Sequence, residues 1–152
     1  MTTIKLFLTM ILLVLLTTSL FAQDISKDVE AIKEIIQSAY VDGLQNDGDM
    51  EKIDKGFHQD FNLLGIGKNN QMWKLPISKW KEDVAKKVET GEMPLKGENR
   101  VTIKFLNIDV TGTAAVAKIE YYIGQKLIYV DYISLYKFGE DWKIVSKIFY
   151  RF

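Results

Sequence analysis

The sequence predicts an α+β domain in which three helices precede and cover a curved antiparallel meander sheet. Two observations carry this prediction. Apolar side chains recur at helical spacing in three early segments, residues 29–44, 50–53 and 77–88. Four strand-like runs then follow, separated by short polar turns, at about 101–110, 113–123, 126–138 and 142–151. Helices grouped ahead of consecutive strands pack on one face of the sheet.

The three helices are marked by apolar stripes and by residues that end them. The first stripe contains Val29, Ile32, Ile35, Ile36, Tyr40 and Leu44, and Gly43, Asn46 and Gly48 mark its end. Asp49 begins a short second helix, which ends at Gly56 before a strand at 57–64. Residues 68–71 then form a polar turn. The third helix starts at residues 76–78 and stops at Thr90-Gly91, before a loop over 92–99.

The hairpin over 113–138 has two faces, and both are apolar enough to need cover. Counting outward from the turn at Gly124-Gln125 puts Ile119 and Tyr121 on a wholly apolar face, and Lys118 and Asp131 on a mixed one. Helices can cover one face. A second copy of the chain is the simplest cover for the other, so we expect a homodimer through the sheet.

Residues 1–22 have the layout of a secretory signal peptide. Lys5 precedes an apolar run over residues 6–21, and Ala22 supplies the small residue before a cleavage site. The run is shorter than the ~18 residues of a membrane span, so we expect no stable membrane anchor after cleavage. The mature domain would be residues 23–152, exported to the periplasm or secreted.

Composition excludes several classes of partner. The chain has 20 basic and 20 acidic residues, and losing Lys5 leaves the mature domain at a formal charge of −1. Such a balance gives no field for nucleic acid or membrane surfaces. With no cysteine and a single histidine, His58, we expect neither disulfides nor a metal site. No motif for a cofactor is present, and none is expected.

Asp131 is the acidic residue that stands out, because it lies between Val130 and Tyr132 in an apolar strand. Facing a pocket, it could act as a base or anchor a ligand. The alternative comes from strand register. A two-residue turn at Gly124-Gln125 places Lys118 opposite Asp131, and a cross-strand ion pair would then explain the carboxylate structurally.

Aromatic residues supply the remaining candidates. Tyr40 could reach a pocket from the first helix, or could pack in the core with its hydroxyl bonded to backbone. Trp80 and Trp142 fit core and sheet packing. Trp73 follows the polar turn and is a candidate for a pocket mouth.

Three segments together resemble the nuclear transport factor 2-like superfamily. They are residues 40–44, YVDGL, residues 47–51, DGDME, and residues 57–61, FHQDF. The tail, with DYISLYK at 131–137 and DWKIVSKI at 141–148, is most similar to the putative lumazine-binding family. The resemblance implies a cone-shaped domain of cystatin-like topology, in which helices close a curved sheet around a pocket, and which is commonly dimeric.

The resemblance also bears on catalysis. Isomerases and cyclases of this superfamily carry a catalytic acid a few residues past the position of Asp60, where this chain has Gly65 and no ionisable side chain from Phe61 to Gly67. Proton abstraction needs a positioned base. This departure favours a non-catalytic domain.

Three functional hypotheses remain. The first is an exported, non-catalytic binding or accessory domain that holds an apolar or aromatic molecule against Tyr40, Phe57, Trp80 and Asp131. The second is a proton-transfer enzyme of the isomerase or dehydratase kind, with Asp131 as base and Tyr40 as hydrogen-bond donor. The third is a structural dimerisation module whose cone is filled.

Overall fold

The computed structural model describes residues 25–152, and its helices precede the meander of β3 to β6 in the chain. Residues 25–35 are α-helical, and η1 (Ile36–Asp47) continues that helix with wider, i→i+5 turns until Gly48, whose φ of 70° suits glycine. Helix α2 (Met50–Gly56) begins at Asp49, whose carboxylate accepts from the backbone N–H groups of Glu51 and Lys52. Helix α3 is Ile77–Glu89, and η2 (Lys68–Asn70) and η3 (Gly97–Asn99) are single turns. Within residues 25–152, no helix is both long enough and apolar enough to cross a membrane.

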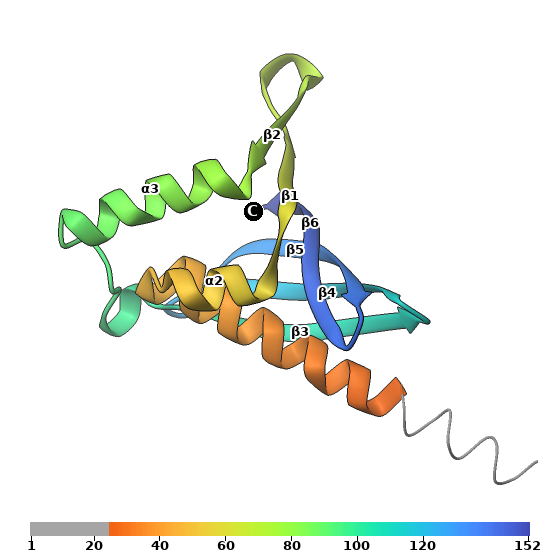
Figure 1. Cartoon of the computed structure of the whole chain (residues 1–152). Helices are drawn as coiled ribbons and strands as arrows, with labels where there is room; N and C mark the ends of the chain where they lie inside the picture. The colour runs from red at the N-terminus through yellow and green to blue at the C-terminus, as the bar shows by residue number, and fades with distance from the viewer. Residues whose placement is uncertain (1–24) are drawn as a thin grey trace, which may run out of the picture.

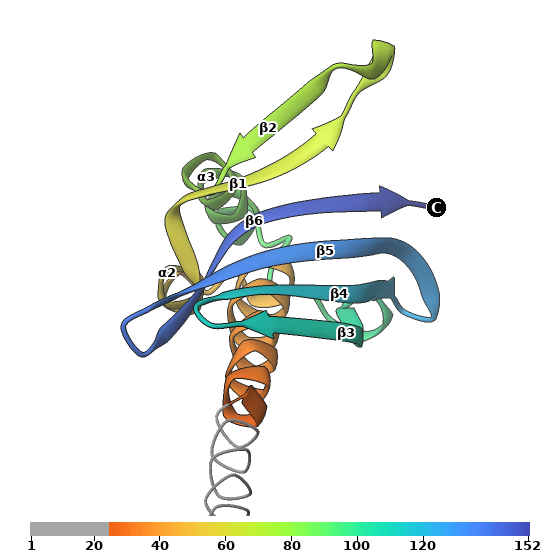
Figure 2. The same ribbon diagram turned by 90° about the vertical axis from the view of Figure 1, so that its right-hand side faces the viewer.

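Six strands form one sheet, in the order β2-β1-β6-β5-β4-β3 (Figure 2). They are β1 (Phe57–Ile66), β2 (Met72–Pro76), β3 (Val101–Thr111), β4 (Ala114–Ile123), β5 (Lys126–Phe138) and β6 (Asp141–Arg151). The expected meander is confirmed in β3 to β6, which pair antiparallel in sequence order. The chain after the polar turn was not expected to be a strand, but β2 pairs with β1, and β1 joins the meander by lying parallel to β6.

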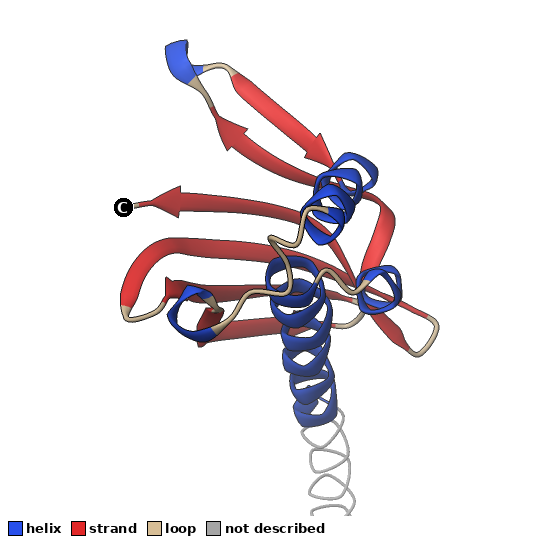
Figure 3. Ribbon diagram, turned by 90° about the vertical axis from the view of Figure 1, so that its left-hand side faces the viewer, coloured by secondary structure: helices blue, strands red, loops and turns tan. Residues whose placement is uncertain are grey.

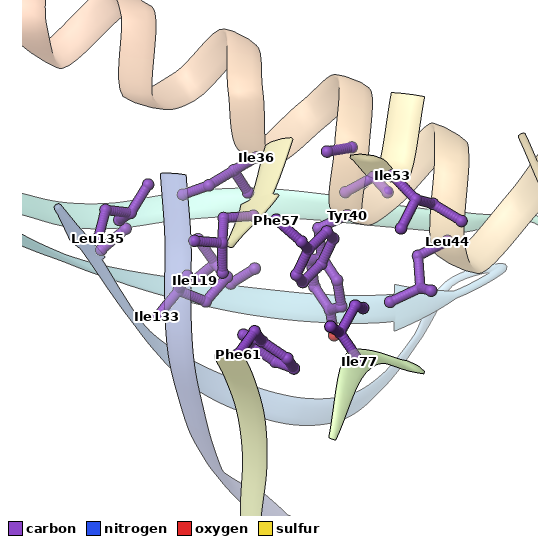
Figure 4. Packing of buried hydrophobic residues seen from close by; sticks show 14 of the residues in the cluster. Ile36, Tyr40, Leu44, Ile53, Phe57, Phe61, Ile77, Ile119, Ile133 and Leu135 are labelled. Atoms are coloured by element: carbon purple, nitrogen blue, oxygen red, sulfur yellow. The ribbon is translucent and has the colours of Figure 1, made fainter. Parts of the chain in front are cut away.

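All three helices lie on one face of the curved sheet (Figures 1 and 3). The first helix crosses the strands, and the core fills the space between them (Figure 4). Fully or nearly fully buried members come from the helix (Ile36, Tyr40, Leu44), from β1 (Phe57, Phe61), from α3 (Ile77) and from β4 and β5 (Ile119, Ile133, Leu135). The α+β fold class predicted from the sequence is therefore confirmed.

A β-bulge in the β4–β5 hairpin overturns the expected register. The turn does pair Ile123 with Lys126, but the pairing shifts by one residue between Tyr121 and Tyr122. As a result Asp131 lies opposite Ile119, and Lys118 lies opposite Tyr132. The predicted Lys118–Asp131 ion pair is wrong, since the Lys118 ammonium instead sits 5.4 Å from the Tyr132 ring centroid.

The same bulge corrects the predicted faces. Beyond it, Asp131, Ile133 and Leu135 of β5 share the helix-covered face with Ile119 and Ala117 of β4 and are buried. A bulge exchanges faces because the side-chain period of a strand is two residues. The wholly apolar face and the mixed face predicted by simple counting thus become one buried face, which includes Asp131, and one outer face.

A second bulge reorients the end of β6. Pairing shifts by one residue between Leu135–Ile144 and Ser134–Ser146, so that Lys147 lies opposite Ile133 and Phe149 opposite Asp131. Without the extra residue, Lys147 would have faced outward beside Tyr132. With it, a lysine enters the covered face of the sheet.

The outer face of the sheet carries large apolar side chains in contact with solvent. We use the name outer face for the side defined by Val116, Tyr132, Tyr136, Ile148 and Tyr150, each between 39% and 62% exposed. Tyr132 and Ile148 are cross-strand partners, so at least part of this set is contiguous. Isolated exposed apolar residues are ordinary, but a contiguous group marks an interaction surface.

Candidate ligand pocket

A cavity of about 350 Å³ lies where β6 ends and β5 begins, on the helix-covered face. Side chains from every strand except β3 and from two helices reach it. The lining residues are Tyr40, Gln45, Leu63, Trp73, Trp80, Tyr121, Tyr129, Lys147, Phe149 and Arg151. The groove between residues 31–38 and the β5–β6 turn is lined largely by charged side chains, whereas the other described hollows have mixed polar and apolar linings. The aromatic cavity alone among them contains buried ionisable groups, and we take it as the candidate site.

Aromatic rings form most of the cavity wall and hold one another in place. The Tyr40 and Trp80 rings meet edge to face with centroids 6.4 Å apart. Tyr129 lies between Tyr121 at 5.3 Å and Phe149 at 5.4 Å, again near perpendicular. Such pairs favour fixed geometry because ring edges are positive and ring faces negative. The rings of the cavity wall therefore hold one another in fixed positions.

A buried network of three side chains lies at the base of the cavity. The Tyr40 hydroxyl donates to Asp131 Oδ2 at 2.7 Å, and Lys147 Nζ donates to the Tyr40 hydroxyl at 2.9 Å. Lys147 Nζ is also 2.9 Å from Asp131 Oδ1. Asp131 is fully buried and does not line the cavity, whereas Tyr40 and Lys147 do. The carboxylate is closed off behind its two partners.

Burial determines the protonation tendencies of this network. Burial raises the pKa of the Tyr40 hydroxyl well above its usual value, and the adjacent Asp131 charge raises that pKa further. For Lys147, burial lowers the pKa, while the Asp131 carboxylate opposes that shift. Tyr121 behaves like Tyr40, since burial and then Asp131 raise its pKa. Near neutral pH the phenols are therefore protonated donors.

Gly65 leaves room for the indole ring of Trp73. The two residues are cross-strand partners in the β1–β2 hairpin, and a Cβ at Gly65 would lie 2.2 Å from Trp73 Cζ2. The indole can lie against the backbone only because residue 65 lacks a side chain. Gly65 thus places the indole that forms part of the cavity wall.

The residues predicted from the sequence divide into three groups. Tyr40 and Trp80 line the cavity, and Trp73 lies at its edge, 38% exposed. Tyr40 was expected either to pack in the core or to reach a pocket, and it does both. Its hydroxyl donates to Asp131 rather than to a backbone group. Asp131 stands behind the wall. Phe57 does not reach the cavity, because it packs edge to face on Phe61 with centroids 4.9 Å apart.

Two other aromatic predictions can be placed. Trp142 is buried in the sheet and its indole N–H donates to Asp28 at 2.9 Å, which ties the first helix to β6. The His58 ring stacks on Phe138 with centroids 4.8 Å apart. Among residues 25–152, no group of three or more potential ligands is placed to hold a metal.

Sequence reasoning missed Lys147, Gln45, Arg151 and Phe149. Gln45 accepts from the Tyr121 hydroxyl at 3.0 Å, and Arg151 is exposed at the rim. Alternation along β6 would have turned Lys147, Phe149 and Arg151 outward, and only the bulge turns them in. The available signal was the charge of Lys147. A lysine next to the apolar run Ile148-Phe149-Tyr150 is expected to have an oppositely charged partner if it is buried.

Comparisons with known proteins agree on the fold. The family model described as putative lumazine-binding matches residues 27–150. A nuclear transport factor 2-like protein of unknown function from Shewanella baltica OS155 has a similar structure, with a TM-score of 0.65, 22% identity, and coverage of 84% of this chain and 95% of that one. One from Silicibacter pomeroyi DSS-3 also has a TM-score of 0.65, at 16% identity over 84% and 98% of the two chains.

A third similar structure has a different fold description. A domain of unknown function with a cystatin-like fold from Nostoc punctiforme PCC 73102 has a TM-score of 0.56 and 13% identity, over 83% of this chain and 78% of that one. At these identities the structures show the fold alone. No curated protein matches the chain significantly.

Proposed function

Because the chain belongs to the putative lumazine-binding family of the nuclear transport factor 2-like superfamily, we propose that it is a binding domain for a small planar aromatic molecule. The observation that carries the proposal is the aromatic cavity with a buried, charge-compensated network at its base. Ligand sites are typically such cavities, largely apolar with a few convergent polar groups.

The size of the cavity supports a small ligand. Its volume of about 350 Å³ is near the lower end of the roughly 300–1,000 Å³ found for ligand sites. Tyr129, Phe149 and Trp73 offer ring faces and edges on its sides. A one- or two-ring compound fits these walls better than a flexible chain does, because stacking rewards a flat shape.

Binding without catalysis is better supported than proton transfer. A general base must come within hydrogen-bond reach of the proton it removes. Asp131 is fully buried, and Tyr40 and Lys147 occupy its oxygens. None of the ten residues lining the cavity is an aspartate or glutamate. The network therefore supports a structural and ligand-orienting role for Asp131.

The proposal extends to location and assembly. The layout of residues 1–22, which lie outside the described residues, supports export and cleavage near Ala22. The exposed apolar residues of the outer face support a homodimer through the sheet. The domain would then act outside the cytoplasm, as a pair of cones joined by their sheets.

A binding experiment tests the proposal. Mature protein, residues 23–152, is titrated by calorimetry with lumazine, a flavin and two-ring aromatic compounds, and is also examined by native mass spectrometry for a retained ligand. We expect saturable binding of at least one two-ring compound, weakened by Phe149→Ala. Tyr150→Ala is the matched control, because it removes the next ring along β6 from the outer face.

Two results would overturn the proposal. One is the absence of saturable binding across the whole panel. The other is binding that Phe149→Ala leaves unchanged while Tyr150→Ala weakens it, since that would move the site to the outer face.

A further inference from the structure

We infer that the ligand is an aromatic acid bound in one direction, with a hydrogen-bond acceptor on its inner edge toward Lys147 and its anionic group at the rim toward Arg151. This inference rests on the proposed function and adds the chemical class of the ligand. It follows from the polar groups of the wall, their charge balance and their spacing on β6.

The wall offers donors in excess of acceptors. The Tyr121 hydroxyl donates to Gln45 Oε1, which leaves the Gln45 amide NH₂ as the free part of that side chain. The Tyr40 hydroxyl is committed to Asp131. Lys147 and Arg151 are donors only, as are the indoles of Trp73 and Trp80. A ligand that satisfies this wall must be rich in acceptors.

The charges of the lining residues also favour an anionic ligand. Lys147 and Arg151 are the charged residues that line the cavity, and both are cationic. Asp131 compensates Lys147 from behind the wall. Within the described part of the chain, no ion pair is formed by Arg151. The site therefore has a net charge of about +1, located at its rim.

The spacing of the side chains along β6 assigns a role to each end of the ligand. Lys147, Phe149 and Arg151 alternate on β6, so they face the same side and span about 13 Å from first to last. Phe149 lies between the two cations and provides a surface for the ring. Lys147 Nζ donates one proton to the Tyr40 hydroxyl, and its contact with Asp131 Oδ1 is an ion pair without hydrogen-bond geometry. A remaining proton of the ammonium suits a neutral acceptor, because a second anion there would lie beside the buried Asp131 carboxylate. The exposed Arg151 can bind an anion with little desolvation.

The first arm of the test compares compounds of one shape and different charge. Mature protein is titrated by calorimetry with 2-naphthoate, its methyl ester and 2-naphthylmethylammonium. We expect the acid to bind about fivefold more tightly than the ester, the size of an exposed ion pair, and the ammonium compound to bind most weakly. Arg151→Gln should reduce the affinity for the acid to that for the ester. Lys118→Gln removes one positive charge from the outer face and should change neither the affinity for the acid nor that for the ester.

The second arm tests the inner acceptor. Quinoline-6-carboxylate places a ring nitrogen opposite its acid group and should bind more tightly than 2-naphthoate. The double variant Asp131→Leu/Lys147→Met, which removes the network without leaving a lone charge, should abolish that preference while Arg151 still favours acids over esters.

The outcomes separate the two proposals. Equal affinity for acid, ester and ammonium compound overturns the inference and leaves an aromatic-binding domain. Loss of acid preference in Lys118→Gln but not in Arg151→Gln also overturns it. Failure of every ring compound to bind overturns the proposed function itself.

Discussion

Asp131 Oδ1 and Lys147 Nζ lie 2.9 Å apart on neighbouring strands, with the carboxylate fully buried and the lysine nearly so. They are diagonal neighbours, because Asp131 is paired with Phe149 and Lys147 with Ile133. Each charge compensates the other where both side chains are buried. Tyr40 joins both, so the first helix is tied to the sheet at the base of the cavity.

Removing one partner of this pair should destabilise the domain strongly. Asp131→Asn or Lys147→Met leaves the other charge buried without compensation, and each should lower the free energy of unfolding by about 3–5 kcal/mol. The double variant Asp131→Leu/Lys147→Met should cost less than either single change. Urea unfolding followed by circular dichroism measures all three.

An exposed pair provides the control for that cycle. Lys79 and Glu82 are 2.9 Å apart on α3 but remain in contact with solvent, so Lys79→Met should lower stability far less than either change in the buried pair. If the double variant is as destabilised as the sum of the two single variants, the residues do not act as a pair.

Gly65→Ala should displace Trp73 and reshape the cavity. The added Cβ would overlap the indole, which must move away from β1. We expect a change in tryptophan emission and weaker ligand binding, with a small change in stability because Trp73 is partly exposed. Gly67→Ala is the graded control, since its Cβ would lie 3.3 Å from Trp73 Cδ1 and should disturb the ring less. Equal binding by wild type and Gly65→Ala would show that Trp73 does not shape the site.

The raised pKa of Tyr40 predicts a loss of stability at alkaline pH. Its phenol keeps a proton in the folded state that the unfolded chain releases near pH 10. This contribution is present below about pH 10 and falls as pH rises toward the folded-state pKa. The lowered pKa of Lys147 acts in the opposite direction. Unfolding free energies of wild type and Tyr40→Phe between pH 8 and 11 isolate the contribution of the Tyr40 phenol, and the variant should lose less stability over that interval.

Tyrosine absorbance gives an independent check. Fewer than the seven tyrosines of the sequence should ionise near pH 10 while the protein is folded, and the remainder should ionise on unfolding. Ionisation of all seven in the folded protein would contradict a buried, protonated Tyr40.

The outer face should mediate a homodimer. Size-exclusion chromatography with light scattering should give twice the mass of the mature chain for wild type. Ile148→Asp should give a monomer, because it buries a charge in an apolar interface. Lys126→Asp, at the exposed β4–β5 turn, is the control and should remain a dimer. A monomeric wild type would leave the outer face without a partner.

Export predicts a shortened N-terminus. Expressed in full length in a bacterium with a secretory pathway, the chain should appear in the periplasm or medium with a mass that begins at Gln23. Intact-mass spectrometry checks the cleavage site, and Ala22→Glu should retain the leader by removing the small residue before the cut. A full-length chain in the exported fraction would indicate that residues 1–22 remain attached.

Local patterns were sufficient to predict most of the elements. Helical spacing from Val29 to Leu44 and from Ile77 to Val88 predicted two helices, and glycine turns bounded four strands within about a residue. Strand β2 was missed because Met72–Pro76 is only five residues long and directly follows the polar turn, although Met72, Trp73 and Leu75 are apolar. It becomes a strand through pairing with β1, a contact that its own composition does not specify.

The sequence by itself determined the α+β class, the order of the main elements apart from β2, and the presence of an unusual acid at position 131. Tertiary structure decided what that acid does. Two bulges, one in β5 and one in β6, shift the register by a residue each, move Asp131 away from Lys118 and bring it to Lys147. The physical reason is that a strand changes face with every residue, so one unpaired residue reverses every assignment beyond it. Whether a curved sheet takes that extra residue depends on packing against the helices, which alternation along a single strand does not reveal.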